Sequence, residues 1–191
     1  MKSVELLTLF PTFMDMSTYF YKKYNELQIE IDTITSLPDW HKTPNRLALA
    51  KSEQKICAYS SVLYEALAAE AYINYYGSKR LGLEYFKNRL DKLDFINKYL
   101  VVTKLITGNE FPTSEHIFEK LQDLHSARTK LVHSKSVQYD SLSDNSITDA
   151  TEKLYKFKGK RIENTMKYLY GVCKELMYVV AKMEGSEKLI Y

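Results

Sequence analysis

Few positions in this chain can stop a helix. The sequence holds 6 glycines and 4 prolines among 191 residues, and its apolar side chains return every three or four positions almost throughout. Since an α-helix has 3.6 residues per turn, this spacing gathers the apolar side chains on one face of each helix. The alternation of apolar and polar residues that is typical of strands is absent. The pattern predicts an all-α fold, an antiparallel bundle of five to six helices.

Prolines, glycines and capping residues divide this pattern into elements. In chain order we first expect a long helix after Pro11 and a second helix from about residue 45 to 76 that stops at Gly77. One or two helices follow over 83–106, and another helix starts near Pro112. After a polar loop over 134–150, we expect one final helix with a near-heptad seam from Ile162 to Val180. A chain of this length fits a single domain, 1–191. Within it, residues 1–44 are expected to form a helical extension and residues 45–185 the main bundle.

Charge and cysteine content narrow the class of protein. The 27 lysines and arginines nearly balance the 24 aspartates and glutamates, so the net charge of +3 does not by itself indicate nucleic-acid binding. Cys57 and Cys173 lie in apolar helical patterns and are expected in the core, because their spacing fits neither a zinc site nor a disulfide framework. No run reaches the ~18 apolar residues of a membrane helix, and the apolar stretch before Pro11 is too short for a signal peptide. We expect a reduced, cytoplasmic protein without a cofactor or a membrane partner.

Residues 124–133, with the sequence LHSARTKLVH, carry the polar groups best suited to chemistry. Arg128 offers a planar fork of donors that fits phosphate oxygens, and His133 is the residue type most readily poised to exchange a proton near neutral pH. Together they could cleave a phosphodiester without a metal. His125 and Thr129 share one flank of the helix with His133, at positions i, i+4 and i+8. No third ligand of suitable spacing accompanies the two histidines, so no metal site is predicted.

Arg128 interrupts the apolar stripe of its helix, and two polar residues do the same on an earlier helix. A charge on such a stripe needs a partner, because burying it alone is costly. We therefore predict that Glu70 pairs with Arg128 and that Asn74 lies near them. A buried ion pair that only fixes the helix register is the alternative interpretation. The two stripes consist of Ile117, Leu121, Leu124 and Leu131 on the later helix and of Ile56, Tyr59, Leu63 and Leu67 on the earlier one.

Basic and aromatic residues are unevenly distributed. Five basic residues without an acid fall between positions 153 and 161, where they could follow a phosphate backbone or form a solvated helix face. The 16 tyrosines favour core edges and oligomer interfaces over stacking on unpaired bases. Candidates for RNA binding are Lys130, Lys135, Lys156, Lys160 and Arg161.

With these residues in place, the chain resembles the HEPN superfamily (higher eukaryotes and prokaryotes nucleotide-binding). Members are bundles of four to five helices whose signature is an arginine followed four to six residues later by a histidine, a spacing that Arg128 and His133 satisfy. Thr129 occupies the position where the family usually has asparagine or another amide or acid. The likeness covers roughly residues 50–180. Its further parts are the segments 105–111 and 118–121 before the motif and the helix 65–74, with Glu70 and Asn74 four residues apart.

The resemblance implies metal-independent RNA cleavage by a homodimer, often within toxin–antitoxin or antiviral systems. In such an enzyme His133 would move the proton, Arg128 would clamp the scissile phosphate and Glu70 would orient Arg128. The partners would be RNA, a second copy of the chain and an antitoxin protein. The alternatives are a non-catalytic RNA- or nucleotide-binding module, which Thr129 and the modest net charge favour, and a dimeric scaffold.

Overall fold

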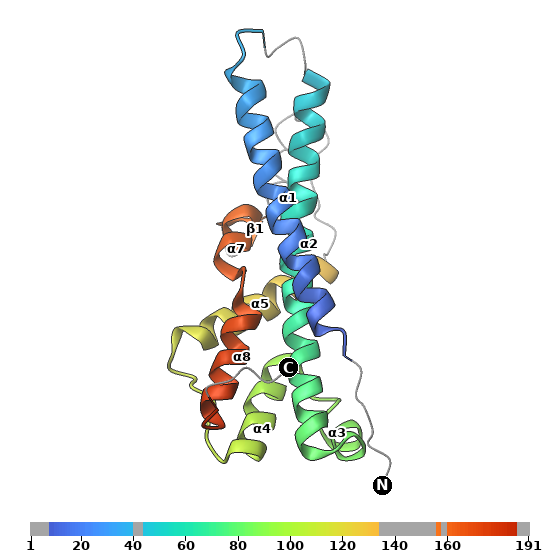
Figure 1. Ribbon diagram of the computed structural model, residues 1–191, viewed down its shortest axis with the longest axis vertical. Helices are drawn as coiled ribbons and strands as arrows, with labels where there is room; N and C mark the ends of the chain where they lie inside the picture. Colours follow the sequence, from blue (N-terminus) through green and yellow to red (C-terminus); the bar gives the residue numbers. More distant parts are fainter. Residues whose placement is uncertain (1–7, 40–43, 134–155, 158–159, 187–191) are drawn as a thin grey trace, which may run out of the picture. The chain divides into compact units, whose positions relative to one another are not determined.

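The computed structural model describes residues 8–39, 44–133, 156–157 and 160–186, and nearly all of them are helical (Figure 1). The helices are α1 (Phe10–Ser36), α2 (Pro44–Leu81), α3 (Leu83–Arg89), α4 (Phe95–Thr107), α5 (His116–Val132), α7 (Ile162–Leu169) and α8 (Val172–Met183). The strands β1 (Lys156–Phe157) and β2 (Lys160–Arg161) form a short antiparallel pair. The all-α prediction is thus confirmed. Among the described helices, none combines the length and the apolar character that a membrane crossing requires.

The chain forms two compact units, each assembled from segments that are distant in sequence. Unit 1 comprises Met1–Met16, Tyr64–Ser126 and Gly171–Tyr191. Unit 2 comprises Ser17–Leu63 and Ala127–Tyr170. The expected extension, residues 1–44, contributes to both units, and each unit is described by itself below.

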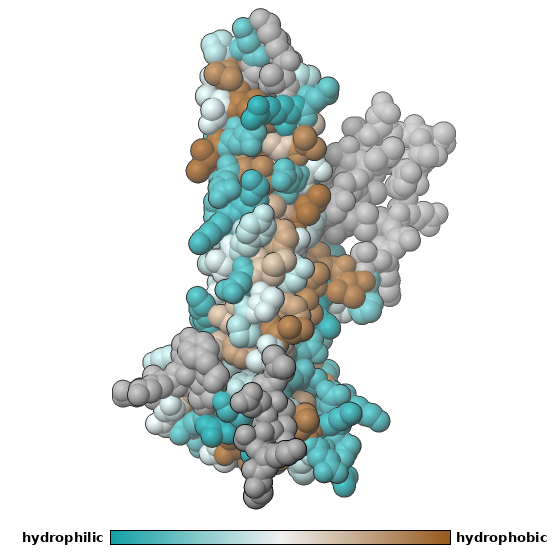
Figure 2. All heavy atoms as spheres, turned by 45° about the vertical axis from the view of Figure 1, so that its right-hand side comes forward, coloured by the Kyte–Doolittle hydropathy of each residue, from teal (hydrophilic) through white to brown (hydrophobic). Residues whose placement is uncertain are grey.

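In unit 2, α1 from Ser17 onward and the first half of α2 form an antiparallel helical hairpin (the blue and cyan helices at the top of Figure 1). Ser17 and Ser61, both buried, exchange hydroxyl-to-carbonyl hydrogen bonds of 3.1 and 3.2 Å. Farther along, Arg46 forms an ion pair of 2.9 Å with Glu30. Residue numbers rise on one helix as they fall on the other, which fixes the antiparallel direction. Apolar residues lie scattered among hydrophilic ones on the hairpin face in Figure 2, as is normal for a protein surface.

The buried face of α2 is not the one that the sequence predicted. Ile56 is 58% exposed, so the line drawn through it is wrong. The buried residues follow a neighbouring line of small side chains, along which alanines let other helices approach closely. This line contains Ala58, Val62, Ala66, Ala69 and Ile73.

Two glycines exchange the functions expected of them. α2 passes through Gly77, where an added Cβ would lie 2.5 Å from the Phe86 ring, so this glycine makes room for α3. α2 ends instead at Leu81, before Gly82 with φ +89°. Conversely, Gly171, with φ +84°, divides the expected final helix into α7 and α8. A positive φ suits glycine and stops a helix.

The core of unit 1 packs α8 against the second half of α2, α4 and the start of α5. Its largest fully buried side chains are Tyr72, Tyr76, Tyr99, Leu121, Leu124, Leu176 and Met177. The expectation of one or two helices over 83–106 is met by α3 and α4, and Asp94 caps α4 by accepting hydrogen bonds from the N–H groups of Ile96 and Asn97. Both cysteines are buried and unpaired by disulfide, Cys57 at 3% and Cys173 at 0% exposure, which confirms their predicted place in the core.

Candidate functional site

Arg128 and His133 lie at the C-terminal end of α5, in unit 2. The helix forms because its buried stripe, Ile117, Leu121 and Leu124, recurs at helical spacing. The N–H of His133 donates to the Thr129 carbonyl at 2.9 Å and closes the last turn. Arg128 is half-buried, and Thr129, Lys130 and His133 are exposed. Solvent therefore reaches the imidazole, as a site for a large substrate requires.

The motif residues diverge around the helix axis. In a regular α-helix, two residues five positions apart are separated by about 140° around the axis and about 7.5 Å along it. Arg128 and His133 therefore leave α5 in different directions, whereas Thr129 shares the flank of His133. One copy of α5 does not by itself aim the guanidinium and the imidazole at one phosphate. Two copies of α5, or a bent substrate strand, could engage both groups.

His125 differs from His133 in its surroundings. It is half-buried in unit 1, and its ring stacks on Phe95 with a centroid distance of 5.8 Å and an angle of 29°. Its Nδ1 atom is buried and has no hydrogen-bond partner among the described residues. The pKa of the Asp94 carboxyl is lowered mainly by the hydrogen bond from the Asn97 backbone N–H. The charge of His125 makes a smaller contribution in the same direction. This packing favours a structural function for His125, and its supporting role in the site stays a prediction.

Glu70 and Asn74 lie one turn apart on α2, in unit 1, and both are half-buried. The Oδ1 atom of Asn74 is buried and accepts no hydrogen bond from a described residue. Asn74 also lines a pocket of about 350 Å³ together with Phe13, Tyr75 and Ser78. The predicted pairing of Glu70 with Arg128 would join residues of different units, and it stays a prediction.

Glu65 is a buried carboxylate that the sequence analysis did not single out. It is 4% exposed, and its Oε1 atom accepts a hydrogen bond of 2.8 Å from the backbone N–H of Cys173, in the first turn of α8. A carboxylate at a helix N-terminus is favoured by the helix dipole. Burial, and then the nearby Glu65 carboxylate, raise the pKa of the Cys173 thiol. The signal in the sequence was an acid on the alanine-rich face of α2, and it indicates a structural contact.

Positive charge is concentrated in the part of unit 2 that contains the motif. The described residues of Ala127–Tyr170 hold six basic side chains and one acid, Glu163. By sequence, unit 1 has 12 lysines and arginines against 14 aspartates and glutamates, a net charge of −2, whereas unit 2 has 15 against 10, a net charge of +5. The uneven distribution is hidden in the overall charge of +3.

The RNA-binding candidates are only partly described. Lys130 and Arg161 are exposed. Lys156 pairs with Arg161 in the backbone register of β1 and β2, and Phe157 pairs with Lys160. Lys135 lies outside the described residues, as do Lys153, Lys158 and the loop expected over 134–150. Among the described candidates for RNA binding, two exposed cations, Lys130 and Arg161, therefore lie in unit 2.

The described tyrosines range from fully buried to largely exposed. Tyr24, Tyr72, Tyr76 and Tyr99 are at most 4% exposed. Burial raises the pKa of the Tyr72 and Tyr76 hydroxyls. Tyr19 and Tyr178 are among the exposed tyrosines, with exposed fractions of 59% and 60%. The interface function expected of tyrosines remains a prediction for these exposed rings.

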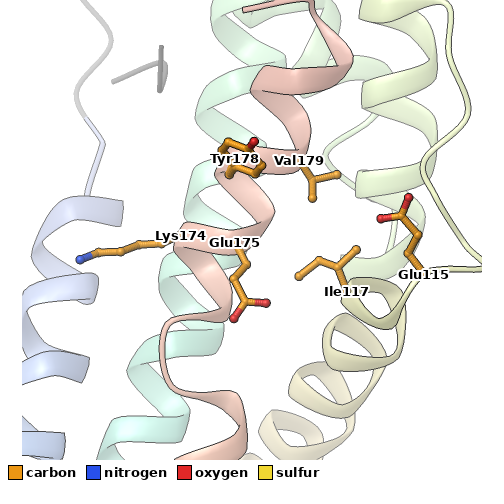
Figure 3. A pocket seen from close by; sticks show the side chains of 6 residues that line it. All are labelled: Glu115, Ile117, Lys174, Glu175, Tyr178 and Val179. Atoms are coloured by element: carbon orange, nitrogen blue, oxygen red, sulfur yellow. The ribbon is translucent and has the colours of Figure 1, made fainter. Parts of the chain in front are cut away.

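A second hollow lies in unit 1, between α8 and the start of α5 (Figure 3), and it contains none of the motif residues. Within the described ranges, no three His, Cys, Asp or Glu side chains come together as a metal site would require. Comparisons of the chain with protein-family models, curated proteins and solved structures find no match.

Proposed function

We propose that this protein is a metal-independent endoribonuclease of the HEPN type that acts as a homodimer. The observation that carries the proposal is the C-terminal end of α5, where a half-buried Arg128 and the exposed Lys130 and His133 lie within two turns, in a segment whose described residues hold six basic side chains and one acid. A cation for the phosphate and a group that exchanges protons near neutral pH are the two requirements for such cleavage.

The reaction follows from the chemistry of RNA. The 2′-hydroxyl attacks the adjacent phosphorus, so the bond between O2′ and phosphorus forms while the bond from phosphorus to O5′ breaks. One imidazole takes the 2′-hydroxyl proton, and a second gives a proton to the departing O5′. Guanidinium groups stabilise the negative charge on the phosphate oxygens. The products are a 2′,3′-cyclic phosphate and a 5′-hydroxyl, and DNA is not cut because it lacks the nucleophile.

A twofold dimer supplies the second imidazole. One copy contributes one motif histidine, whereas a C2 dimer that brings two α5 ends together contributes His133 and Arg128 twice. The divergence of the two side chains on one helix supports a site shared between copies. In this proposal, as the family resemblance implies, Glu70 would orient Arg128. An antitoxin protein that covers the groove between the α5 ends would control the enzyme.

The second candidate is an RNA-binding module that does not cut. Thr129 favours it, because its exposed side chain is shorter than the amide or acid usual in the family. Such a module would bind RNA through Lys130 and Arg161, with a strong dependence on salt.

Cleavage of a single-stranded RNA in EDTA separates the candidates. We expect His133→Ala and Arg128→Ala each to slow cleavage by about 100-fold or more. The matched control is His116→Ala, since His116 is an exposed histidine at the other end of α5, where it contacts Glu119. The control should cleave at the wild-type rate. If wild-type protein binds RNA without cutting it, or if His133→Ala cuts as fast as wild type, the enzyme proposal is wrong.

A further inference from the structure

The hollow between α8 and the start of α5 combines apolar, aromatic and charged side chains in its lining (Figure 3). Its volume is about 400 Å³. Ile117 is buried in its floor, Val179 is half-buried, and the Tyr178 ring is 60% exposed. The remaining lining residues are Glu115, Lys174 and Glu175. Aromatic residues are enriched at protein interfaces, and this ring is exposed beside an apolar floor.

The charges around the groove differ in how they are engaged. Both carboxylate oxygens of Glu175 accept hydrogen bonds from Lys120 Nζ, at 2.8 and 2.9 Å. Lys174 extends sideways from α8, away from Glu175 and Ile117, as Figure 3 shows. Glu115 is exposed and makes no ion pair within the described part of the chain. One carboxylate that lines the groove, Glu115, thus has no ion pair among the described residues, in a unit whose net charge is −2.

We infer that this groove binds an arginine side chain presented by a segment of a partner protein. The aliphatic stem of arginine suits the apolar floor formed by Ile117 and Val179. Its planar cation can stack on Tyr178 and direct its fork of donors at Glu115. Lysine matches the stem and the charge but neither the plane nor the fork, and a neutral apolar side chain leaves Glu115 unused. Arginine is therefore the side chain that uses every feature of the groove.

This inference does not depend on the proposed ribonuclease. The groove belongs to unit 1, whereas Arg128 and His133 belong to unit 2. A protein that cuts no RNA could still bind a partner here, and an active enzyme could have an empty groove.

The test is an NMR titration of the full chain with N-acetyl-L-arginine N-methylamide. We expect saturable shifts of the backbone amides of Ile117, Tyr178 and Val179. Binding should be about fivefold tighter than that of the lysine analogue and of the citrulline analogue, which has nearly the shape of arginine without its charge. Glu115→Gln and Tyr178→Ala should each weaken binding about fivefold, and both residues are exposed, so the variants should fold. Glu119→Gln, a neighbouring exposed carboxylate that does not line the groove, should leave binding unchanged.

Three results would overturn the inference. The first is a titration without saturation or with shifts outside the groove. The second is equal binding of the arginine and citrulline analogues, which would show that the groove does not recognise the charge and the donor geometry of the guanidinium. The third is a dimer of the full chain that Glu115→Gln and Tyr178→Ala both dissociate, because a second copy would then occupy the groove instead.

Discussion

The carboxylate of Glu65 is predicted to hold the N-terminus of α8 in place. It is 4% exposed, and it accepts a 2.8 Å hydrogen bond from the backbone N–H of Cys173, a residue with 0% exposure. Glu65→Ala would leave the N–H buried and unpaired, at a cost of about 1–3 kcal/mol. For a chain of this length, such a loss lowers Tm by roughly 2–4 °C per kcal/mol, or about 2–12 °C in all.

The isosteric change separates the hydrogen bond from the charge. Glu65→Gln keeps an acceptor at the same place and removes the attraction between the carboxylate and the helix dipole, so we expect a loss below about 1 kcal/mol. Urea unfolding followed by circular dichroism measures the free energy of unfolding for both variants. Glu26→Ala is the control, because Glu26 is exposed and forms a surface ion pair of 3.5 Å with Lys23. A cost below about 0.5 kcal/mol for Glu65→Ala, or equal costs for the alanine and glutamine variants, would refute this function of Glu65.

Three further predictions rest on other features. Gly77→Ala should cost about 1–3 kcal/mol in urea unfolding, because its Cβ would meet the Phe86 ring at 2.5 Å; an unchanged midpoint would show that α3 shifts freely. Stability should fall as pH rises above about 9, because burial raises the pKa of the Cys173 thiol in the folded chain, so that only the unfolded chain releases this proton; a flat profile of urea midpoints from pH 8 to 10.5 would contradict the buried, neutral thiol. Thr129→Asn, which restores the residue usual in the HEPN family, should speed RNA cleavage several-fold; an unchanged or lower rate would show that this position does not assist catalysis.

The helical pattern was readable from the sequence, but the function of individual glycines was not. Gly77 and Gly171 both interrupt apolar repeats, and nothing local distinguishes them. The difference depends on a ring 9 residues farther on, because Phe86 occupies the space that a Cβ of Gly77 would take. Tertiary contacts of this kind lie beyond a pattern of period 3.6.

The buried face of α2 was mispredicted for a related reason. Its alanines and its larger apolar residues follow neighbouring lines, and the sequence analysis chose the larger residues, including Ile56. In the structure the small residues of α2 are the buried ones, because they allow close helix packing. Glu65, which lies beside them on the helix, is buried as well. On α5, where apolar residues follow one stripe, Ile117, Leu121 and Leu124 were predicted correctly.

The candidate site was predictable as far as one helix determines it. The motif spacing placed Arg128 and His133 near the end of a helix, and α5 ends there. The exposure of His133 depends on what packs around α5, and the pairing of Glu70 with Arg128 depends on how two helices are placed. Neither can be derived from the spacing of residues along one chain.

The most direct test of the ribonuclease compares one RNA with the same RNA carrying a single 2′-deoxy nucleotide at the cleaved position, both in EDTA. The account predicts that wild-type protein cuts the first to a 2′,3′-cyclic phosphate, identified by mass spectrometry, and leaves the second intact. Equal cleavage of both strands, or no cleavage of either, would contradict an attack by the 2′-hydroxyl at the Arg128–His133 end of α5.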